Sequence, residues 1–258
     1  PRLPLGPGKA TLAVAACAAP VLFGFVAPAA VLGAWAIEAL PGLDSRFFEH
    51  ALNSFLLASA AAVAAVLAAL VMAYGQRLHP DRVTLSAVRV ASLGYAVPGS
   101  VIAVGVMVPL SAIGNATGVL LTGTVVGLVY AYLVRFLAVG FNTVEASLSK
   151  VTPSMEGAAR TLGFAPLATL RRVHVPVMRG SLLTAALLVF VDVLKELPAT
   201  LIMRPFNFDT LAVQAFQAAS DERLGDAAAP ALAIVVVGIV PVVLLSRAIA
   251  RSRPGSAS

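Results

Sequence analysis

Residues 51–74 read ALNSFLLASAAAVAAVLAALVMAY, an unbroken run without a charged side chain. A helix of about 20 apolar residues crosses the hydrocarbon core of a bilayer, which is about 30 Å thick. A transmembrane β-strand would instead alternate apolar and polar residues, and this run does not. The stretch therefore predicts a membrane-spanning α-helix.

The rest of the 258-residue chain has the same character. Hydrophobic residues make up 59% of it and charged residues 12%, and its mean hydropathy is +0.93. Soluble domains carry about 25% charged residues, and disordered chains are rich in charge, so both classes are excluded. The single cysteine, Cys17, excludes an intrachain disulfide and a cysteine-based metal site. We expect an all-α, polytopic membrane protein.

Six stretches are apolar and long enough to predict transmembrane helices. They are Leu12–Ile37, Ala51–Tyr74, Val90–Leu110, Val119–Val139, Leu182–Met203 and Ala227–Leu245. The first is longer than the apolar region of a secretory signal, about 7–15 residues, so we expect it to be retained as an anchor.

Positive charge is unevenly distributed between the connections. Thirteen of the eighteen Lys and Arg residues lie near the two termini and in the second and fourth connections, three lie in the others, and Arg135 and Lys195 fall inside spans. The positive-inside rule then places both termini and these two connections in the cytoplasm. The same bias explains the net charge of +6. We expect no nucleic-acid partner, because no basic run is interleaved with exposed aromatic residues.

The fourth connection, residues 140–180, is the longest, and long ordered connections are usually functional. Residues 152–163 read TPSMEGAARTLG. Thr152 can cap a helix whose first residue is Pro153, Gly163 can end it in a left-handed conformation, and Pro166 can begin the next. Four of its residues share a face by their spacing, and the two alanines would let another protein approach closely. They are Met155, Ala158, Ala159 and Leu162.

This connection resembles the EAA signature of ABC importer permeases, E-A-A-x₃-G-x₉-I-x-L-P. Ala158 and Ala159 are followed at the motif's spacing by Gly163, and then by Val173-His-Val175-Pro176. The position of the motif glutamate holds Gly157, and Glu156, directly before it, is the candidate to replace that carboxylate. The alternative is an ordinary helical hairpin without a function.

The resemblance implies that this loop is a coupling helix, which docks on a separate cytoplasmic ATPase dimer. The implied coupling residues are Glu156, Gly157, Ala158, Ala159, Arg160, Gly163 and Pro176. The chain has no G-x₄-G-K-[ST] phosphate loop. We therefore expect no cofactor on this chain, no enzymatic activity of its own, and ATP and Mg²⁺ on the partner ATPase.

Three charged residues lie in the fifth predicted span, where charges are costly and usually functional or paired. Asp192, Lys195 and Glu196 are spaced to share one helix face, and Pro198 can loosen the helix just beyond them. One interpretation is a polar lining or gate of a translocation path. The alternatives are a self-neutralised packing pair of Asp192 with Lys195, and a span that ends early so that Glu196 reaches the outer interface.

Residues 190–212, FVDVLKELPATLIMRPFNFDTLA, and 219–224, ASDERL, resemble the ferric-iron subgroup of these permeases. In that subgroup one chain often holds two similar halves, and this sequence resembles the second half, which would explain why it begins with Pro1. The resemblance implies a bacterial inner-membrane location, a second permease half, and a periplasmic ferric-iron-binding protein facing Arg204, Asn207 and Asp209. It also implies three regions: a cytoplasmic segment 1–10, a transmembrane permease domain 11–247 with the coupling loop 140–180, and a cytoplasmic tail 248–258.

The residues themselves do not identify a metal site. His50, His79 and His174 fall in different connections, and Lys195 between Asp192 and Glu196 argues against a stable cation site, so we expect no metal ligands. Importers of sulfate, thiamine or polyamines share the coupling loop and are alternatives. A proton-coupled transporter could use Asp192 and Glu196 as titrating groups. An intramembrane enzyme is disfavoured, because no H-E-x-x-H motif or nucleophile elbow is present.

Overall fold

The computed structural model describes residues 6–252, and within them it contains helices and no strand. The α-helices are α1 Pro7–Val21, α2 Ala27–Ala39, α3 Ser45–Leu78, α4 Arg82–Ala91, α5 Gly99–Thr117, α6 Val125–Leu148, α7 Pro153–Thr161, α8 Pro166–Thr169, α9 Val175–Leu194, α10 Pro198–Met203, α11 Leu211–Ser220 and α12 Leu224–Ser252. Short π-helical segments, Leu22–Val26 and Leu170–His174, join α1 to α2 and α8 to α9. Two 3₁₀ segments, Leu40–Gly42 and Ser92–Ala96, precede α3 and α5.

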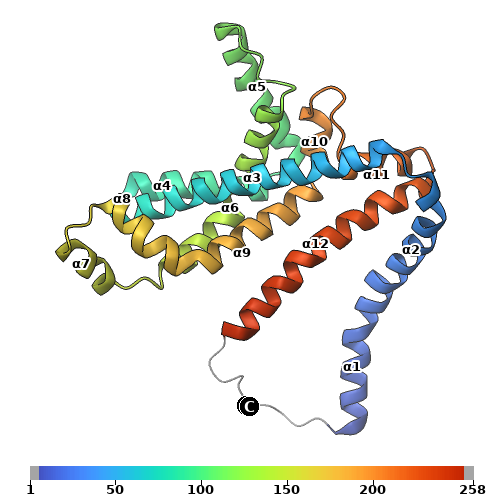
Figure 1. The fold of residues 1–258 in the computed structure, drawn as a ribbon, viewed down its shortest axis with the longest axis horizontal. Helices are drawn as coiled ribbons and strands as arrows, with labels where there is room; N and C mark the ends of the chain where they lie inside the picture. The colour runs from blue at the N-terminus through green and yellow to red at the C-terminus, as the bar shows by residue number, and fades with distance from the viewer. Residues whose placement is uncertain (1–5, 253–258) are drawn as a thin grey trace.

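Three long helices, α3, α6 and α9, pack side by side and form the centre of the molecule (Figure 1). Helix α7 projects at one end of this trio, which we call the α7 end, and α11 lies across the other, which we call the α11 end (Figure 1). The fold therefore separates two candidate functional regions by the full length of the bundle.

Small side chains allow the three central helices to approach closely. Alanines recur on one stripe of α3 and are buried against the other two helices: Ala58, Ala61, Ala62, Ala65, Ala69 and Ala73. Opposite them, a Cβ built on Gly140 of α6 would lie 3.6 Å from the carbonyl oxygen of Ala65. Packing of this kind is typical of membrane helices, because lipid is as apolar as the side chains and close contact must supply the stabilisation.

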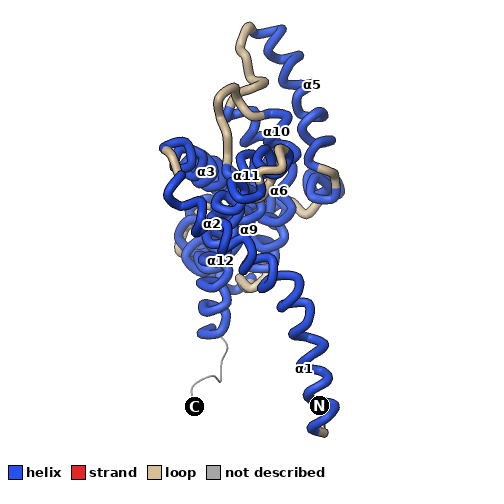
Figure 2. Tube along the Cα trace, turned by 90° about the vertical axis from the view of Figure 1, so that its right-hand side faces the viewer, coloured by secondary structure: helices blue, strands red, loops and turns tan. Residues whose placement is uncertain are grey.

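The remaining long helices lie outside the central trio. Helix α12 packs along α2 and against α9, and α1 extends away from the bundle without a buried residue (Figure 1). Helix α5 projects from the body in both views (Figures 1 and 2). Its apolar side chains Val101, Val104 and Val108 are more than half exposed.

Within residues 6–252, five helical segments are long and apolar enough to cross a membrane. They are Pro7–Gly42, Ser45–Leu78, Gly99–Thr117, Val125–Leu148 and Pro166–Leu194. A shorter apolar segment, Leu224–Val240, coincides with the sixth stretch expected from sequence. The chain is therefore a polytopic all-α membrane protein, as predicted.

The third and fourth spans begin later than predicted. In the third, the chain is not one helix over Val90–Leu110: a 3₁₀ segment interrupts it, and α5 begins after Pro98. The 3₁₀ segment brings Gly94 so near α6 that a Cβ there would lie 1.9 Å from the carbonyl oxygen of Val134. Helix α6 begins at Val125 rather than Val119, because the Thr124 hydroxyl accepts a hydrogen bond from the amide of Gly127 and caps it.

The fifth span also differs, since its helix begins before Leu182 and ends at Leu194 instead of Met203. Pro198 lacks an amide proton and its ring clashes with the carbonyl four residues earlier, so it begins the separate helix α10. The connection 140–180 is in turn more helical than expected. Helix α6 continues to Leu148 and the chain is helical again from Pro166, with α7 between them.

Candidate functional site

Helix α7 forms as its sequence predicts, with Pro153 in its first turn and a left-handed glycine after its end. Gly163 has φ +79°, its amide donates to the carbonyl of Arg160, and the amide of Phe164 donates to that of Ala159. These two bonds are the Schellman arrangement that satisfies the last carbonyls of a helix. Thr152 occupies the cap position, but its hydroxyl bonds to that of Ser154 and not to a backbone amide.

The two faces of α7 have different surroundings. Ala159 is buried against the body of the protein, whereas Met155, Ala158 and Leu162 are exposed, the last at 72%. The expectation that these four share one outward face is therefore wrong for Ala159. Gly157 is partly buried, Arg160 is exposed in the last turn, and Pro176 is exposed in the first turn of α9. The outward surface of α7 thus combines small and apolar side chains with the exposed Arg160.

Glu156 points to the chain's own helices. Its carboxylate lies 2.7 Å from Nε of Arg77 in α3 and 3.1 Å from Nε2 of His174, whose side chain is fully buried. Arg77 was not among the residues singled out from sequence. It lies far from Glu156 in the chain, and only the tertiary fold brings the two side chains together.

The charges of the fifth span separate into two groups. Lys195 Nζ lies 2.9 Å from Asp192, and the lysine side chain is 63% exposed. Glu196 follows the end of α9 and turns away from this pair toward α6. The expectation that all three share one helix face is wrong, because the helix ends before Glu196. The alternative of a self-neutralised Asp192–Lys195 pair describes this geometry. The span also ends early, as the other alternative had it, but Glu196 is buried and does not reach the surface.

Glu196 is buried and forms an ion pair with Arg135 of α6, with 3.2 Å between Oε2 and Nε. Its other carboxylate oxygen accepts a hydrogen bond from the amide of Ala199, at the start of α10. Arg135 Nη1 also donates to the carbonyl of Val97, at 3.1 Å. The pair therefore joins α6, the α9–α10 break and the segment before α5. Arg135 falls inside a predicted span, where charged residues are usually functional or paired, and that location was the available signal for it.

Two neighbours fix this ion pair in place. A Cβ on Gly99 would lie 2.3 Å from Oε1 of Glu196 and 2.7 Å from Nη1 of Arg135, so the first turn of α5 leaves room for the pair only with glycine. The hydroxyl of Thr200 donates to the carbonyl of Glu196 and lies 2.5 Å from the hydroxyl of Tyr132. Pro198 is the first residue of α10 and lies in the chain between Glu196 and Thr200.

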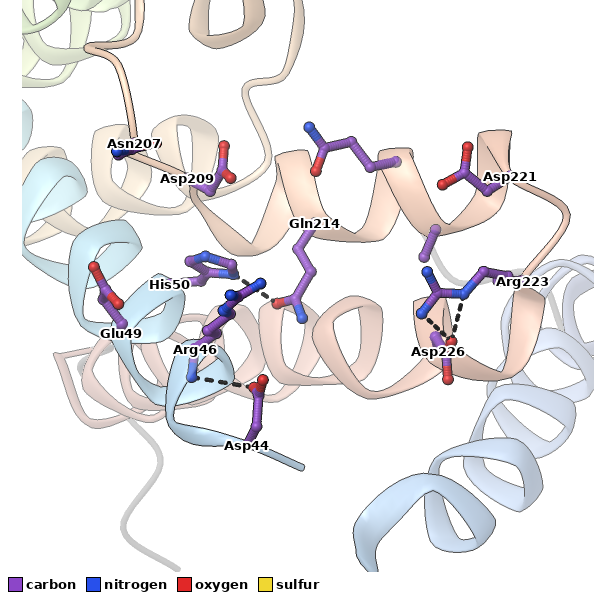
Figure 3. A pocket seen from close by; sticks show the side chains of 12 residues that line it. Asp44, Arg46, Glu49, His50, Asn207, Asp209, Gln214, Asp221, Arg223 and Asp226 are labelled. Carbon is purple, nitrogen blue, oxygen red and sulfur yellow. Dashed lines mark hydrogen bonds and ion pairs between the residues drawn. The ribbon is translucent and has the colours of Figure 1, made fainter. Parts of the chain in front are cut away.

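At the α11 end, a hollow of about 620 Å³ opens between the start of α3, the α10–α11 connection and the start of α12 (Figure 3). Its lining residues are Asp44, Arg46, Glu49, His50, Asn207, Asp209, Gln214, Gln217, Ala218, Asp221, Arg223 and Asp226. Five of these are acidic and two are arginines, so the hollow is negative overall.

Asn207 and Asp209 line this hollow, and Arg204 lies next to them. Arg204 forms an ion pair with Asp209, Asn207 adopts φ +57°, and Phe206 between them is 95% exposed. This connection presents an aromatic side chain and a polar edge to the surroundings. Within residues 6–252 no three His, Cys, Asp or Glu side chains are grouped so that they could hold a metal ion.

Comparison with known proteins relates the chain to transport permeases. No protein-family model matches it. It is 29% identical over 203 residues to the Fe(3+)-transport system permease protein FbpB 2 of Haemophilus influenzae, covering 79% of this chain and 39% of that protein. It is 27% identical over 156 residues to the putative 2-aminoethylphosphonate transport system permease protein PhnV of Salmonella typhimurium, covering 60% of this chain and 57% of that one. The chain thus spans less than two thirds of either relative.

Solved structures show the same fold. One is a bacterial ABC transporter involved in the import of the acidic polysaccharide alginate, with a TM-score of 0.71 and 13% identity over 95% of this chain and 97% of that one. Another is a bacterial alginate ABC transporter in complex with an alginate pentasaccharide-bound periplasmic protein, with a TM-score of 0.70 and 13% identity over 92% and 93%. The chain therefore has the fold of ABC importer permeases, and its sequence is similar to permeases of that class.

Proposed function

We propose that this chain is a transmembrane permease subunit of an ATP-driven importer in a bacterial inner membrane. The observation that carries the proposal is α7, a short helix that projects from one end of the bundle. It turns Glu156 and Ala159 inward and leaves Met155, Ala158 and Leu162 exposed. Such a surface suits docking on a cytoplasmic ATPase dimer, which would hold the ATP and Mg²⁺.

The α7 end then faces the cytoplasm and the α11 end the periplasm, in agreement with the distribution of Lys and Arg. A periplasmic binding protein would dock over Arg204, Asn207 and Asp209. Phe206 offers an exposed apolar anchor there, and the negative hollow beside it favours a partner with a basic rim. The exposed valines of α5 suit contact with a second permease half.

Glu196 is the residue that we place at the gate of the translocation path, together with Arg135. Both charges lie inside the bundle where the helix between α9 and α10 is broken, and broken helices at membrane depth occur where they line a cavity or are buried in protein. Asp192 and Lys195 stand one turn away, and the exposed lysine suits the rim of that path.

Ferric iron is the favoured cargo, because the similarity to FbpB 2 covers more of this chain than the similarity to PhnV. The second candidate cargo is a phosphonate such as 2-aminoethylphosphonate, which the PhnV relatives suggest. The two differ in charge, so a single uptake assay separates them.

The test is uptake by proteoliposomes that hold the chain with its second permease half and ATPase, in the presence of the binding protein. We expect uptake of radioactive Fe³⁺ that requires ATP on the side of the membrane where the ATPase is bound. This uptake should persist when a protonophore is added. Uptake of labelled 2-aminoethylphosphonate but not of iron would change the cargo and keep the class. Uptake that needs a proton gradient and no ATP would replace the importer with a secondary transporter.

A further inference from the structure

The last turn of α3 gathers the elements of the α7 end around one guanidinium. Arg77 Nη1 and Nη2 each donate a hydrogen bond of 2.6 Å, to the carbonyls of Leu148 and Val151, while Nε faces Glu156 at 2.7 Å. Leu148 is the last residue of α6, so its carbonyl lacks a partner within the helix, and a cation is favourable there.

A second side chain of α3, Tyr74, holds the start of α8, the helix that follows α7. The hydroxyl of Tyr74 donates to the carbonyl of Pro166, at 2.8 Å, and its ring packs edge-on against the ring of His174. His174 is fully buried and lies 3.1 Å from Glu156. Helix α7 is thus attached to α3 through a carboxylate, and the segment that follows it is attached through a tyrosine.

The other end of α3 is attached just as directly to the α10–α11 connection. Asn53 Nδ2 donates to the carbonyl of Asp209, at 3.1 Å, and the amide of Leu211 donates to the buried hydroxyl of Ser54, at 2.8 Å. His50 Nδ1 lies 3.1 Å from Oε1 of Gln214 in α11, as the dashed line in Figure 3 shows.

Between these two sets of contacts α3 is one uninterrupted helix of 34 residues, about 51 Å long. No π or 3₁₀ segment divides it, unlike the helices that begin at Pro7 and Pro166. Because no break divides α3 and both α6 and α9 pack against it, a displacement at one end has a continuous helical path to the other.

We propose that α3 is the rigid link that carries movement between the coupling helix and the outer docking surface, and that Arg77–Glu156 is the contact through which α7 drives it. This inference rests on the proposed function. Arg77 is a positioning residue: it holds α7 against α3 and does not itself face the ATPase. In this chain the inward Glu156 makes the intramolecular contact, and the adjacent Gly157 leaves the outward position without a side chain.

The experiment measures ATPase activity of the reconstituted complex with and without the binding protein. Glu156→Gln keeps the shape of the side chain and leaves the Arg77 bonds to the two carbonyls in place. It therefore removes the ion pair with the least change to the rest of the contact. We expect both Glu156→Gln and Arg77→Gln to lose stimulation by about tenfold, and Arg77→Gln, whose side chain does not face the ATPase, to retain basal hydrolysis. The double variant should be no worse than Arg77→Gln alone, because that single variant already removes the contact with Glu156. Glu156→Asp, which keeps the charge, should recover part of the stimulation.

The far end of the link is tested with Asn53→Ala, which should lose stimulation in the same way and also retain basal hydrolysis. Glu145→Gln is the matched control. Glu145 lies on α6 and bonds to Gln76, next to Arg77, without contacting α7 in the bonds that the structure shows. Its stimulation should equal that of the parent chain.

The outcomes separate the two claims. If the parent complex hydrolyses ATP without any response to the binding protein, the proposed function fails. If the parent responds and Glu156→Gln or Asn53→Ala responds equally well, the proposed function stands and α3 is not the link.

Discussion

Gly163 ends α7 with a backbone conformation that L-residues with a side chain rarely adopt. A Cβ at this position would meet nothing within 4 Å, so the cost of a substitution comes from φ +79° and not from crowding. The left-handed conformation costs about 1–2 kcal/mol for a residue with a Cβ, and a β-branched residue is the least tolerant. We expect Gly163→Val to reduce ATP-dependent uptake strongly at unchanged membrane abundance, because α7 can no longer end where it does.

Gly157→Ala serves as the control for that measurement. Gly157 is helical and its Cβ would also meet nothing within 4 Å, so alanine should leave uptake unchanged or strengthen α7 by up to about 1 kcal/mol. Full uptake in Gly163→Val would mean that the end of α7 plays no part in transport.

The two charge pairs near the end of α9 should differ sharply in their contribution to stability. Lys195→Met removes an exposed partner, and such pairs contribute about 0–1 kcal/mol. Glu196→Gln leaves Arg135 without its counter-ion inside the bundle, which costs about 3–5 kcal/mol. We expect a clear fall in the thermal midpoint for Glu196→Gln and almost none for Lys195→Met, measured in detergent.

A second substitution distinguishes a structural role of Glu196 from a role in the path. Arg135→Met combined with Glu196→Gln removes both charges and should restore the thermal midpoint. If uptake stays low in this stabilised double variant, the charges serve transport. If uptake recovers together with the thermal midpoint, the Arg135–Glu196 pair serves only the packing of the helices.

At the scale of elements, the first turn of α5 is fitted to the Arg135–Glu196 pair. Because a Cβ on Gly99 would overlap both side chains, Gly99→Ala must push the pair apart or shift α5, and overpacking of this kind costs about 1–3 kcal/mol. We expect a lower thermal midpoint and lower uptake. Gly105→Ala, in the same helix with nothing within 4 Å of its Cβ, is the matched control and should be neutral or stabilising. Equal thermal midpoints for Gly99→Ala and Gly105→Ala would contradict the close fit of α5 to the ion pair.

The elements also show what could be predicted from the sequence. Hydropathy located the five helical segments that are long enough to cross a membrane and a shorter sixth one, though not all of their bounds, since each segment needs only its own residues to be recognised. The bounds of α7 followed from Pro153, Gly163 and Pro166, whose effects on the backbone are local. The end of α9 was left open between Met203 and an earlier position, because Pro198 can end a helix but proline is also tolerated inside membrane helices.

The contacts between distant elements could not be predicted in this way. Arg135 with Glu196, and Arg77 with Glu156, are each far apart in the chain, and their meeting depends on how α3, α6 and α9 pack. The inward turn of Glu156 likewise depends on the side of α7 that faces α3. A pattern of spacing within one helix carries no information about the neighbour that the helix will meet.

At the scale of the whole molecule, the proposed orientation predicts the location of every turn. Reporter fusions after Gly42 and Asp221 should report the periplasm, and those after His79 and Ser149 the cytoplasm, because the first two lie at the α11 end of the bundle and the last two at the α7 end. Alkaline phosphatase and green fluorescent protein fusions provide the two opposite signals. A periplasmic signal at Ser149 would separate α7 from ATP and contradict the proposed coupling.

The length of α3 has a consequence for the lipid around it. Its apolar part, residues 51–74, is about 36 Å long and exceeds a hydrocarbon core of about 30 Å. A rigid helix accommodates that mismatch by tilting, and the tilt changes with bilayer thickness. Since α3 is tied at Arg77 to one end of the molecule and at Asn53 to the other, a change of tilt displaces both attachments together. The acyl-chain length of the lipids therefore sets the tilt of α3 and, through it, the positions of its two attachments. The thickness of the host membrane thus affects both ends of the molecule.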